Sequence, residues 1–372
     1  MKRILFLIHD LGQGGAEKVL VNLVNNMDRS KFDISVTVLF GGGINEQFLA
    51  SDIHFRAVFP KEIPGNSKLM KLLTPKQLHK LCVKGHYDIE VSYLEGPSAR
   101  VISGCQDPET KLVCWIHSRV ANIQEASGSF RGIQEARNCY SRFHQIVCVS
   151  KWTKQAFLQA FLEQSNVIVL YNTIESQKIL EQAKLPIPDG LFHTNEIKLI
   201  AVGSMKPVKA FDRLIRIHDR LRKSGYPVHT YFLGIGPDFE KLQNQAAELN
   251  QSDTITFLGY ETNPYNYVAK ADLFVCCSLS EGFSTAATEA LIVGTPVCTV
   301  EVSGMKEMLG ENNEWGVVTE NSEEALYDGI KKLLDSPDLL AYYKSRASLR
   351  GQNFRAEETV KDVEQMLLQL KE

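Results

Sequence analysis

Three patterns are missing from this chain of 372 residues, and each absence excludes a class of protein. No run approaches the roughly eighteen consecutive apolar residues that a membrane-spanning helix needs. The opening MKRILFLIHD has too few apolar residues before His9 to be a signal peptide. The eight cysteines lie mostly in apolar runs without Cys-x-x-Cys spacing, which favours reduced, buried thiols over disulfides or zinc ligands. These absences predict a cytoplasmic protein.

The composition is that of a globular protein, with 44% hydrophobic and 23% charged residues. The length predicts two domains, and LPIPDG (Leu185–Gly190) is the expected hinge between them. Expected strands and helices alternate on both sides of this hinge, which predicts an α/β protein with two doubly wound parallel sheets. We place the domains at residues 1–186 and 187–350, followed by a C-terminal helical segment, 351–372.

The net charge of −3 is unevenly distributed. Residues 1–186 carry five more Lys and Arg than Asp and Glu, whereas residues 187–372 carry eight fewer. The basic excess concentrates in Lys61–Lys84, where a helix is expected to begin at Thr74-Pro75. Leu78, Leu81 and Cys82 are expected on one apolar face, beside the lysines. Two interpretations remain open: an ordinary surface helix with solvated lysines, or a contact with an anionic membrane surface.

A glycine-rich loop follows the first expected strand. Gly12, Gly14 and Gly15 invite a dinucleotide-binding interpretation. That interpretation requires an acidic residue at the end of the second strand, but FDISVTVLF ends in three glycines. A nicotinamide cofactor is therefore disfavoured.

The most informative stretch is SLSEGFSTAATEALIVGTPV, residues 278–297. A buried strand leads into a turn at Glu281, and Ser284 or Thr285 is expected to cap a helix that contains Glu289. Free amides at a helix start favour a phosphate, whereas the two carboxylates favour neutral hydroxyls. The pattern suggests a sugar and a ribose on either side of a diphosphate. Alternatively, two glutamates eight residues apart occur by chance, and one belongs to a solvated helix face.

The motifs S-x-x-E-G-F, E-A-L and G-T-P-V in this stretch resemble the donor-site signature of retaining GT-B glycosyltransferases of family 4. The G-G-A-E loop and Y-N-T-I (Tyr171–Ile174) are also similar to this family. The resemblance implies two Rossmann-like domains facing across a cleft, with the C-terminal helix crossing back to the first domain. It also implies transfer of a hexosyl or N-acetylhexosaminyl group, with retention, from a UDP-sugar co-substrate. The expected acceptor is a glycan or lipid-linked molecule in surface polysaccharide synthesis; nucleic acid is not expected as a partner.

The resemblance also assigns roles to residues. Glu281 is expected to hold the donor sugar and Glu289 the ribose, while Lys209 stabilises charge on the β-phosphate. Catalytic roles fall to Glu281, His117 and Lys209. Further donor contacts are expected from Gly14, Gly15, Ser204, Lys206, Tyr260, Gly282, Phe283, Ser284 and Thr285. The expected acceptor contacts are Glu95, His117 and Arg119. A lone histidine such as His117 is more often a structural hydrogen-bonding residue. No Asp-x-Asp occurs in the chain, so we expect neither a metal at the diphosphate nor another cofactor.

The loop Gly203–Ala210 departs from the family pattern G-R-x-x-x-x-K-G. Lys209 matches the lysine, but Ser204 stands in place of the arginine and Ala210 in place of the second glycine. A serine cannot grip phosphate in the bidentate way of arginine. Lys206 either supplies the missing charge or is a solvated surface lysine. Two other functions therefore stay open: a nucleotide-sugar 2-epimerase, and a catalytically weak protein that binds a glycan or nucleotide.

Overall fold

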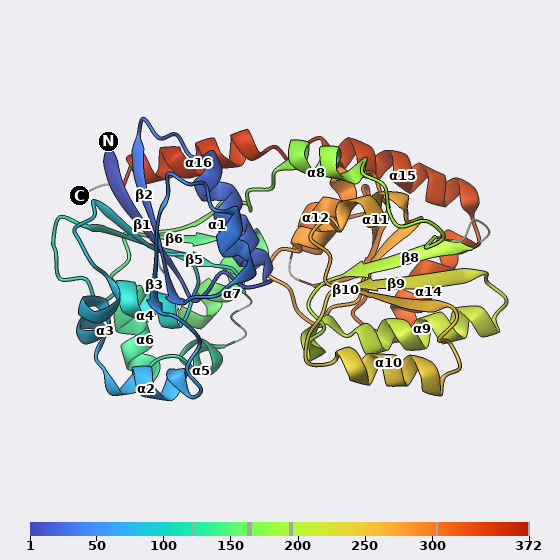
Figure 1. The fold of residues 1–372 in the computed structure, drawn as a ribbon, viewed down its shortest axis with the longest axis horizontal. Coiled ribbons are helices and arrows are strands. Elements are labelled where there is room, and N and C mark those ends of the chain that lie inside the picture. The colour runs from blue at the N-terminus through green and yellow to red at the C-terminus, as the bar shows by residue number, and fades with distance from the viewer. Residues whose placement is uncertain (119, 121, 162–165, 193–195, 303, 371–372) are drawn as a thin grey trace. The chain divides into compact units, whose positions relative to one another are not determined.

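The computed structural model describes residues 1–370 apart from 119, 121, 162–165, 193–195 and 303. The chain forms two compact units (Figure 1). The first comprises Met1–Thr173 together with Ala356–Glu372, and the second comprises Ile174–Arg355. Each unit is an α/β structure built on its own parallel sheet, which confirms the predicted fold class.

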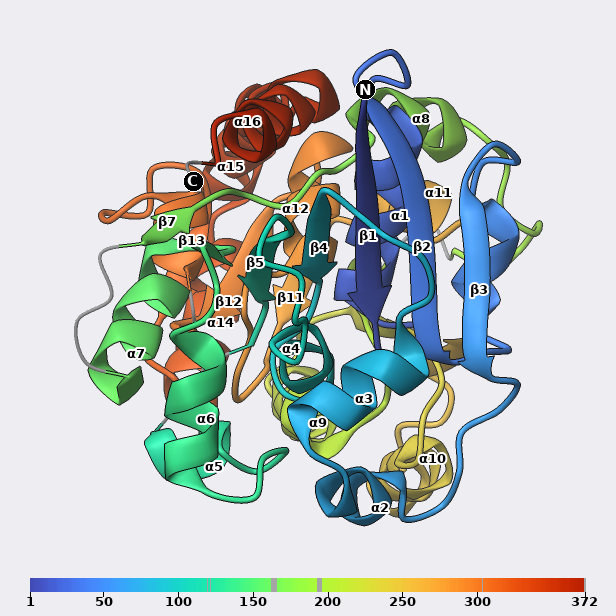
Figure 2. The ribbon, with the colours of Figure 1, turned by 90° about the vertical axis from the view of Figure 1, so that its left-hand side faces the viewer.

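The first unit contains a seven-stranded sheet in the order β3-β2-β1-β4-β5-β6-β7. Its central strands are buried apolar runs, as expected where helices cover both faces. Figure 2 shows β1, β2 and β3 side by side. The strands are β1 (Lys2–Ile8), β2 (Phe32–Phe40), β3 (His54–Phe59), β4 (Ile89–Ser92), β5 (Lys111–Ile116), β6 (Gln145–Cys148) and β7 (Val167–Val169).

The helices of the first unit begin where local sequence signals favour a helix start. Thr74 caps α3 by accepting a hydrogen bond from the Gln77 amide, with Pro75 at the first helical position, as predicted. Of the predicted apolar face of α3, Leu78 and Cys82 are buried, but Leu81 is 43% exposed, so its placement on that face was wrong. The helices are α1 (Gly15–Asn26), η1 (Ile44–Phe48), α2 (Asn66–Leu72), α3 (Pro75–Cys82), α4 (Pro97–Ile102), α5 (Ile123–Ala126), α6 (Ile133–Tyr140), α7 (Lys151–Phe161) and α16 (Ala356–Leu368).

The last helix, α16, completes the first unit by packing against α1 (Figure 1). Val360, Val363 and Leu367 are buried on its inner face. The Glu364 carboxylate accepts hydrogen bonds from the Asp28 amide at 2.6 Å and from Lys31 Nζ at 2.9 Å. Residues more than 300 positions apart are therefore part of one packed unit.

The second unit contains a six-stranded sheet in the order β10-β9-β8-β11-β12-β13. Its strands are β8 (Ile197–Val202), β9 (Val228–Leu233), β10 (Ile255–Gly259), β11 (Leu273–Cys276), β12 (Val297–Val300) and β13 (Val317–Thr319). Its helices are α8 (Ser176–Ala183), η2 (Pro207–Lys209), α9 (Phe211–Lys223), α10 (Phe239–Glu248), α11 (Tyr265–Lys270), α12 (Thr285–Ile292), α13 (Met305–Leu309), α14 (Glu323–Leu334) and α15 (Pro337–Gly351).

The division between the units differs from the one expected at residue 186. Helix α8 belongs to the second unit, because Ile179 packs with Tyr265 and Ile292. At the other end, α15 continues through Gly351, and the segment of the first unit starts at Ala356. Within the described residues, no helix combines the length and apolar character needed to cross a membrane.

Candidate functional site

Two loops of the second unit meet at the carboxyl edge of its sheet, one after β8 and one after β11. The Leu279 amide donates to the Val208 carbonyl at 2.8 Å, and the Cys277 thiol donates to the Lys209 carbonyl. These two hydrogen bonds join the loops, and Lys209 Nζ lies 2.6 Å from Glu281 Oε1. The same oxygen accepts a hydrogen bond from Ser278 Oγ, also at 2.6 Å. Residues that are 72 positions apart therefore form one polar group.

The Lys209–Glu281 pair is largely enclosed, since the side chains are 24% and 11% exposed. Burial lowers the pKa of Lys209, but the neighbouring Glu281 carboxylate outweighs this effect and raises it above the ordinary value. Lys209 is therefore a cation at neutral pH. Sequence reasoning gave the two residues separate tasks and missed Ser278, whose place in the S-x-x-E motif was the available signal.

Helix α12 begins beside this pair. Ser284 is its cap, because Ser284 Oγ accepts a hydrogen bond from the Ala287 amide at 3.3 Å, and Thr285 is the first helical residue. This resolves the choice between the two residues in favour of Ser284. Phe283 is buried, and Glu289 lies in the second turn of the helix, buried at 7% exposure.

The remaining donor candidates differ in exposure. Ser204 is half-buried, whereas Lys206 is exposed and its amide donates to the Ser204 carbonyl. Ala210 has a left-handed backbone (φ 49°, ψ 40°), which explains why glycine suits this position. Tyr260 is half-buried and directly follows the last residue of β10.

In the first unit, His117 follows β5 at the carboxyl edge of the sheet. Its ring packs on Tyr93, with centroids 4.9 Å apart. Burial lowers the pKa of His117 to about 3, so its imidazole is neutral at physiological pH. Among the described residues, His117 Nε2 finds no hydrogen-bond partner, although buried polar atoms nearly always have one. Because open α/β sheets bind ligands at the carboxyl ends of their strands, this unsatisfied nitrogen makes His117 a candidate for a ligand contact.

Glu95 does not present a free carboxylate. Its Oε2 accepts a hydrogen bond from the His117 amide at 2.9 Å, and its Oε1 accepts one from the Ser118 amide at 3.1 Å. These oxygens hold the backbone of the neighbouring turn, and the acceptor contact expected of Glu95 stays a prediction. Arg119, the other acceptor candidate on this turn, lies outside the described residues.

The glycine loop of the first unit contains acidic groups that sequence reasoning left without a role. Gly14 caps α1 and Gly15 begins it, but the Glu17 carboxylate lies so close to Gly14 that a β-carbon there would overlap it. Asp10 accepts from the Gly12 amide at 2.7 Å and contacts His9 Nδ1 at 2.7 Å. An anionic phosphate at Gly14 would therefore lie next to a carboxylate of the protein itself.

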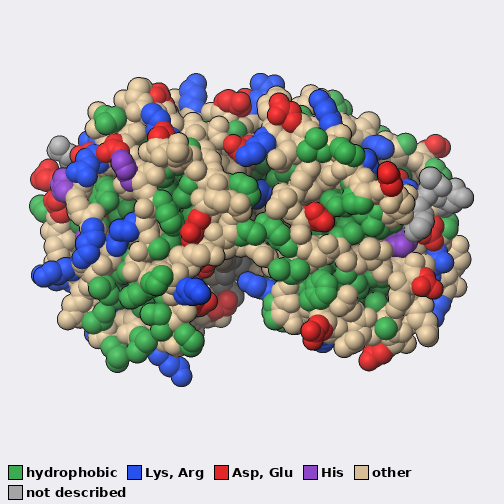
Figure 3. All heavy atoms as spheres, viewed as in Figure 1, with side chains coloured by type: hydrophobic (Ala, Val, Ile, Leu, Met, Phe, Trp, Pro, Cys, Tyr) green, Lys and Arg blue, Asp and Glu red, His purple; other side chains and the backbone are tan. Residues whose placement is uncertain are grey.

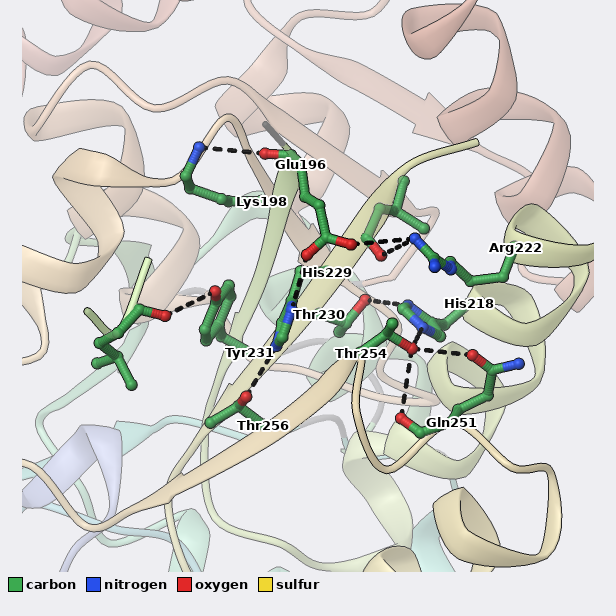
Figure 4. Close-up of polar contacts among 12 residues, drawn as sticks. Glu196, Lys198, His218, Arg222, His229, Thr230, Tyr231, Gln251, Thr254 and Thr256 are labelled. Carbon is green, nitrogen blue, oxygen red and sulfur yellow. Dashed lines mark hydrogen bonds and ion pairs between the residues drawn. The ribbon is translucent and has the colours of Figure 1, made fainter. Parts of the chain in front are cut away.

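A separate polar network occupies the opposite, amino edge of the second sheet (Figure 4). His218 contacts Thr230 Oγ1 at 2.8 Å and Thr254 Oγ1 at 2.9 Å. His229 lies between Glu196 and Thr256. Because these ring nitrogens are all satisfied, the network is structural rather than a second candidate site.

Comparison with known proteins matches both units to glycosyltransferase models. The model "Glycosyltransferase Family 4" matches residues 13–178, and "Glycosyl transferases group 1" matches residues 187–350.

The relatives are consistent with this match. N-acetylgalactosamine-N,N'-diacetylbacillosaminyl-diphospho-undecaprenol 4-alpha-N-acetylgalactosaminyltransferase of Campylobacter jejuni is 26% identical over 376 residues, covering 99% of this chain and 100% of the relative. Lipopolysaccharide 1,6-galactosyltransferase of Escherichia coli is 28% identical over 173 residues, covering 44% of this chain and 45% of the relative. The structure of Anabaena Alr3699/HepE in complex with UDP and glucose has a TM-score of 0.80 at 19% identity, covering 99% of this chain and 100% of that one. This last likeness concerns the fold.

Proposed function

Because the chain belongs to the GT-B glycosyltransferases of family 4 and group 1, we propose that it moves a sugar from UDP to a glycan or lipid-linked acceptor with retention of configuration. The sugar is a hexosyl or N-acetylhexosaminyl group. The bond between the anomeric carbon and the β-phosphate oxygen breaks, and an acceptor hydroxyl forms the new bond on the same face. The proton of that hydroxyl leaves with UDP.

The observation that carries this proposal is the Lys209–Glu281 pair beside the start of α12. UDP is already a good leaving group, so the main task of the protein is to stabilise charge on the β-phosphate. Lys209 and the amides that begin α12 supply positive potential for this task. Glu281 accepts hydrogen bonds from sugar hydroxyls while it keeps Lys209 in place, and Glu289 holds the ribose.

His117 supplies a neutral contact near the reacting bond. Its Nε2 is buried without a protein partner among the described residues, and a sugar hydroxyl would satisfy it.

Lys206 compensates for the missing arginine at Ser204. It lies three residues before Lys209, exposed and free to turn toward an anion. Lys206→Ala should weaken UDP binding by roughly 1–3 kcal/mol, the scale of a charged hydrogen bond. Adding Ser204→Arg should restore much of this loss. Calorimetric titration of UDP into the unmodified protein, the two single variants and the double variant measures both effects, and unchanged affinity in Lys206→Ala would refute the compensation.

Product analysis tests the proposed reaction against its alternatives. The protein is incubated with a panel of UDP-sugars and glycan acceptors, and products are separated by chromatography and identified by NMR. Transfer of the sugar from an α-linked donor to give an α-linked product supports the proposal. Conversion of the donor sugar without an acceptor indicates an epimerase, and UDP binding without either product indicates a binding protein. Activity is expected to persist in EDTA, because the chain has no Asp-x-Asp motif to hold a metal at the diphosphate.

We further propose that the first unit works at the cytoplasmic face of a membrane, where a lipid-linked acceptor lies. The lysine-rich segment also exposes large apolar side chains, with Leu69 53% and Leu72 74% exposed on or at the end of α2. Figure 3 shows hydrophobic side chains on the lower part of the first unit with Lys and Arg side chains around them. Basic residues combined with exposed leucines favour an anionic leaflet.

Vesicle sedimentation tests the membrane contact. Binding should be stronger to anionic than to neutral vesicles and should weaken with salt. Leu69→Ser with Leu72→Ser should reduce binding at every salt concentration, whereas Lys68→Ala with Lys71→Ala should reduce only the part that depends on salt. Equal binding to neutral and anionic vesicles, or no binding, would contradict the proposal.

A further inference from the structure

Three side chains with different donor atoms converge in the first unit, and none of the three residues was given a role in glycosyl transfer above. His79 comes from α3, Glu90 from β4, and Cys105 from the segment that follows α4. The distance from His79 Nε2 to Glu90 Oε2 is 2.7 Å. One ligand atom from each residue lies within 4.8 Å of the other two. In the described part of the chain, no other set of three His, Cys, Asp or Glu residues meets this condition.

The position of Glu90 is unusual for a carboxylate. Strand β4 lies inside the sheet, and Glu90 stands in register between Leu5 of β1 and Leu112 of β5. The side chain is only 3% exposed. A charge in such a place is costly unless a cation compensates it.

Cys105 shares these surroundings. It is 2% exposed and belongs to the same buried apolar cluster as Leu5, Leu78 and Leu112. All eight cysteines of the chain are buried and free, so burial alone does not distinguish Cys105. Its distinction is that it lies beside both an imidazole and a carboxylate, the partners with which a thiolate binds a transition metal.

We propose that His79, Glu90 and Cys105 bind a divalent transition metal ion of the Zn²⁺ type. A neutral imidazole, a carboxylate and a thiolate together carry two negative charges, which a divalent cation neutralises. Nitrogen, oxygen and sulfur donors are the set that Zn²⁺ accepts. A hard cation such as Mg²⁺ or Ca²⁺ would instead require mostly oxygen ligands.

The geometry leaves room for such an ion after a small adjustment. Ligand atoms around tetrahedral zinc lie about 2.0–2.3 Å from the metal, and hence roughly 3.3–3.8 Å from one another. His79 and Glu90 must therefore separate slightly as the ion replaces the proton between them, while the thiol moves inward. His79 is 17% exposed, so an ion can enter on its side, and a water molecule can take the fourth position there.

The bound ion would fasten α3 to the sheet. Its three ligands come from a helix, a central strand and the segment after a second helix, so one ion links all three. This role is structural and is independent of the proposed glycosyl transfer, because the donor candidates Lys209 and Glu281 lie in the other unit. Failure of one proposal therefore leaves the other unaffected.

Cobalt substitution tests the site in the intact protein. Co²⁺ is titrated into the full chain after removal of metals, and absorbance is recorded. We expect saturation at one equivalent with a thiolate-to-cobalt charge-transfer band in the near ultraviolet and visible bands of a tetrahedral ion. Zn²⁺ should displace Co²⁺ and remove both signals. Absence of the thiolate band at saturation would overturn the assignment.

Variants connect the signal to the three residues. Cys105→Ser should abolish the thiolate band, and His79→Gln should weaken Co²⁺ binding by about tenfold or more, since even losing an indirect supporting contact costs that much. Cys82→Ala is the matched control, because Cys82 is equally buried in the same cluster but is not one of the three ligands. Co²⁺ binding that is unchanged in Cys105→Ser, or lost equally in Cys82→Ala, would show that the cluster is only hydrogen-bonded. If Cys105→Ser fails to fold, the cobalt spectrum of the unmodified protein still decides the question.

Discussion

The Lys209–Glu281 pair couples stability to activity at a single contact. Truncating either residue leaves the other charge partly buried without its partner, and an unpaired buried charge lowers the free energy of unfolding. We expect Lys209→Ala and Glu281→Ala each to lower the transfer rate by about two orders of magnitude, as loss of a charge-stabilising group does. Both should also lower the melting temperature. Steady-state kinetics and thermal unfolding on the same samples measure the two effects.

The double variant Lys209→Met, Glu281→Gln separates these effects. It removes both charges while retaining much of the side-chain volume, so its melting temperature should lie above that of either single variant. Its activity should stay as low as theirs. Near-normal activity in any of the three proteins would contradict the proposed roles.

We expect Glu95 to act on the reaction by positioning His117, because its oxygens accept hydrogen bonds from the amides of His117 and Ser118. Glu95→Gln replaces one acceptor oxygen by an NH₂ group that faces an amide donor. We expect the turn to loosen and kcat to fall by about tenfold, the lower part of the range for a mispositioned catalytic group. The affinity for UDP should change little, since Lys209, Glu281 and Glu289 belong to the other unit.

NMR of the His117 ring distinguishes positioning from general destabilisation. Glu95→Gln should shift and broaden this signal, while the signals of His218 and His229 in the second unit should stay in place. An unaltered His117 signal together with lost activity would mean that Glu95 contacts the acceptor directly.

The role of a residue was predictable where the residue belongs to a sequence motif, but not where the role depends on packing. Ser284 was expected as a cap from its type and place, and the structure agrees. Glu95 was expected to contact an acceptor, and the sequence did not reveal that the amides of His117 and Ser118 donate to its oxygens. Leu81 was expected to be buried because it neighbours Cys82 in the helical pattern, but α3 turns that position to solvent. Sequence spacing does not reveal such neighbours.

Among the elements, the long apolar strands and the capped helices α3 and α12 were predictable, whereas the uncapped helix α2 was not. The strands follow from runs of buried residues, whereas α2 has only seven residues and starts after Gly65 in a left-handed conformation. No capping side chain marks the start of this helix. Packing beyond the local sequence stabilises α2: Arg100 donates hydrogen bonds to the carbonyls of Met70 and Leu73.

Helix α9 and strand β9 are joined by a buried histidine that makes the second unit sensitive to acid. Burial lowers the pKa of His218 from 6.5 to about 3. The unfolded chain therefore binds a proton more readily than the folded chain below pH 6.5. The contribution of neutral His218 to the free energy of unfolding is therefore complete above pH 6.5. It falls by about 1.4 kcal/mol for each pH unit as the pH drops toward 3.

His218→Gln removes this titration and keeps an amide in place of the ring. The variant should be less stable than the original at pH 7, and the difference should shrink by about 2 kcal/mol between pH 7 and pH 5. Urea unfolding at several pH values, followed by a signal from the second unit, measures it. A difference independent of pH would show that His218 titrates normally in the folded state.

On the scale of the whole molecule, the number of units and their class followed from the sequence, but the point of division did not. Two prolines and a glycine indicated a hinge at Leu185–Gly190, and such residues do favour irregular backbone. The chain instead changes unit after Thr173, because Ile179 of α8 packs against residues far along the sequence. Long-range packing of this kind has no local signature.

The chain returns to its first unit through helix α16. A protein ending at Arg355 lacks α16 and uncovers the surface of α1 on which Val360, Val363 and Leu367 are buried. Burial of each such side chain is worth roughly 1.5–3 kcal/mol, a large fraction of the stability of an ordinary domain. The truncated chain also loses the Glu364 contacts to the Asp28 amide and to Lys31.

We expect amide exchange in α1 and at the start of β2 to accelerate, while the strands of the second unit keep their protection. Hydrogen exchange with mass spectrometry resolves the two units, and Glu364→Ala in the full chain should affect only the residues around Asp28. Equal protection of α1 with and without α16 would mean that the first unit is stable without its C-terminal helix.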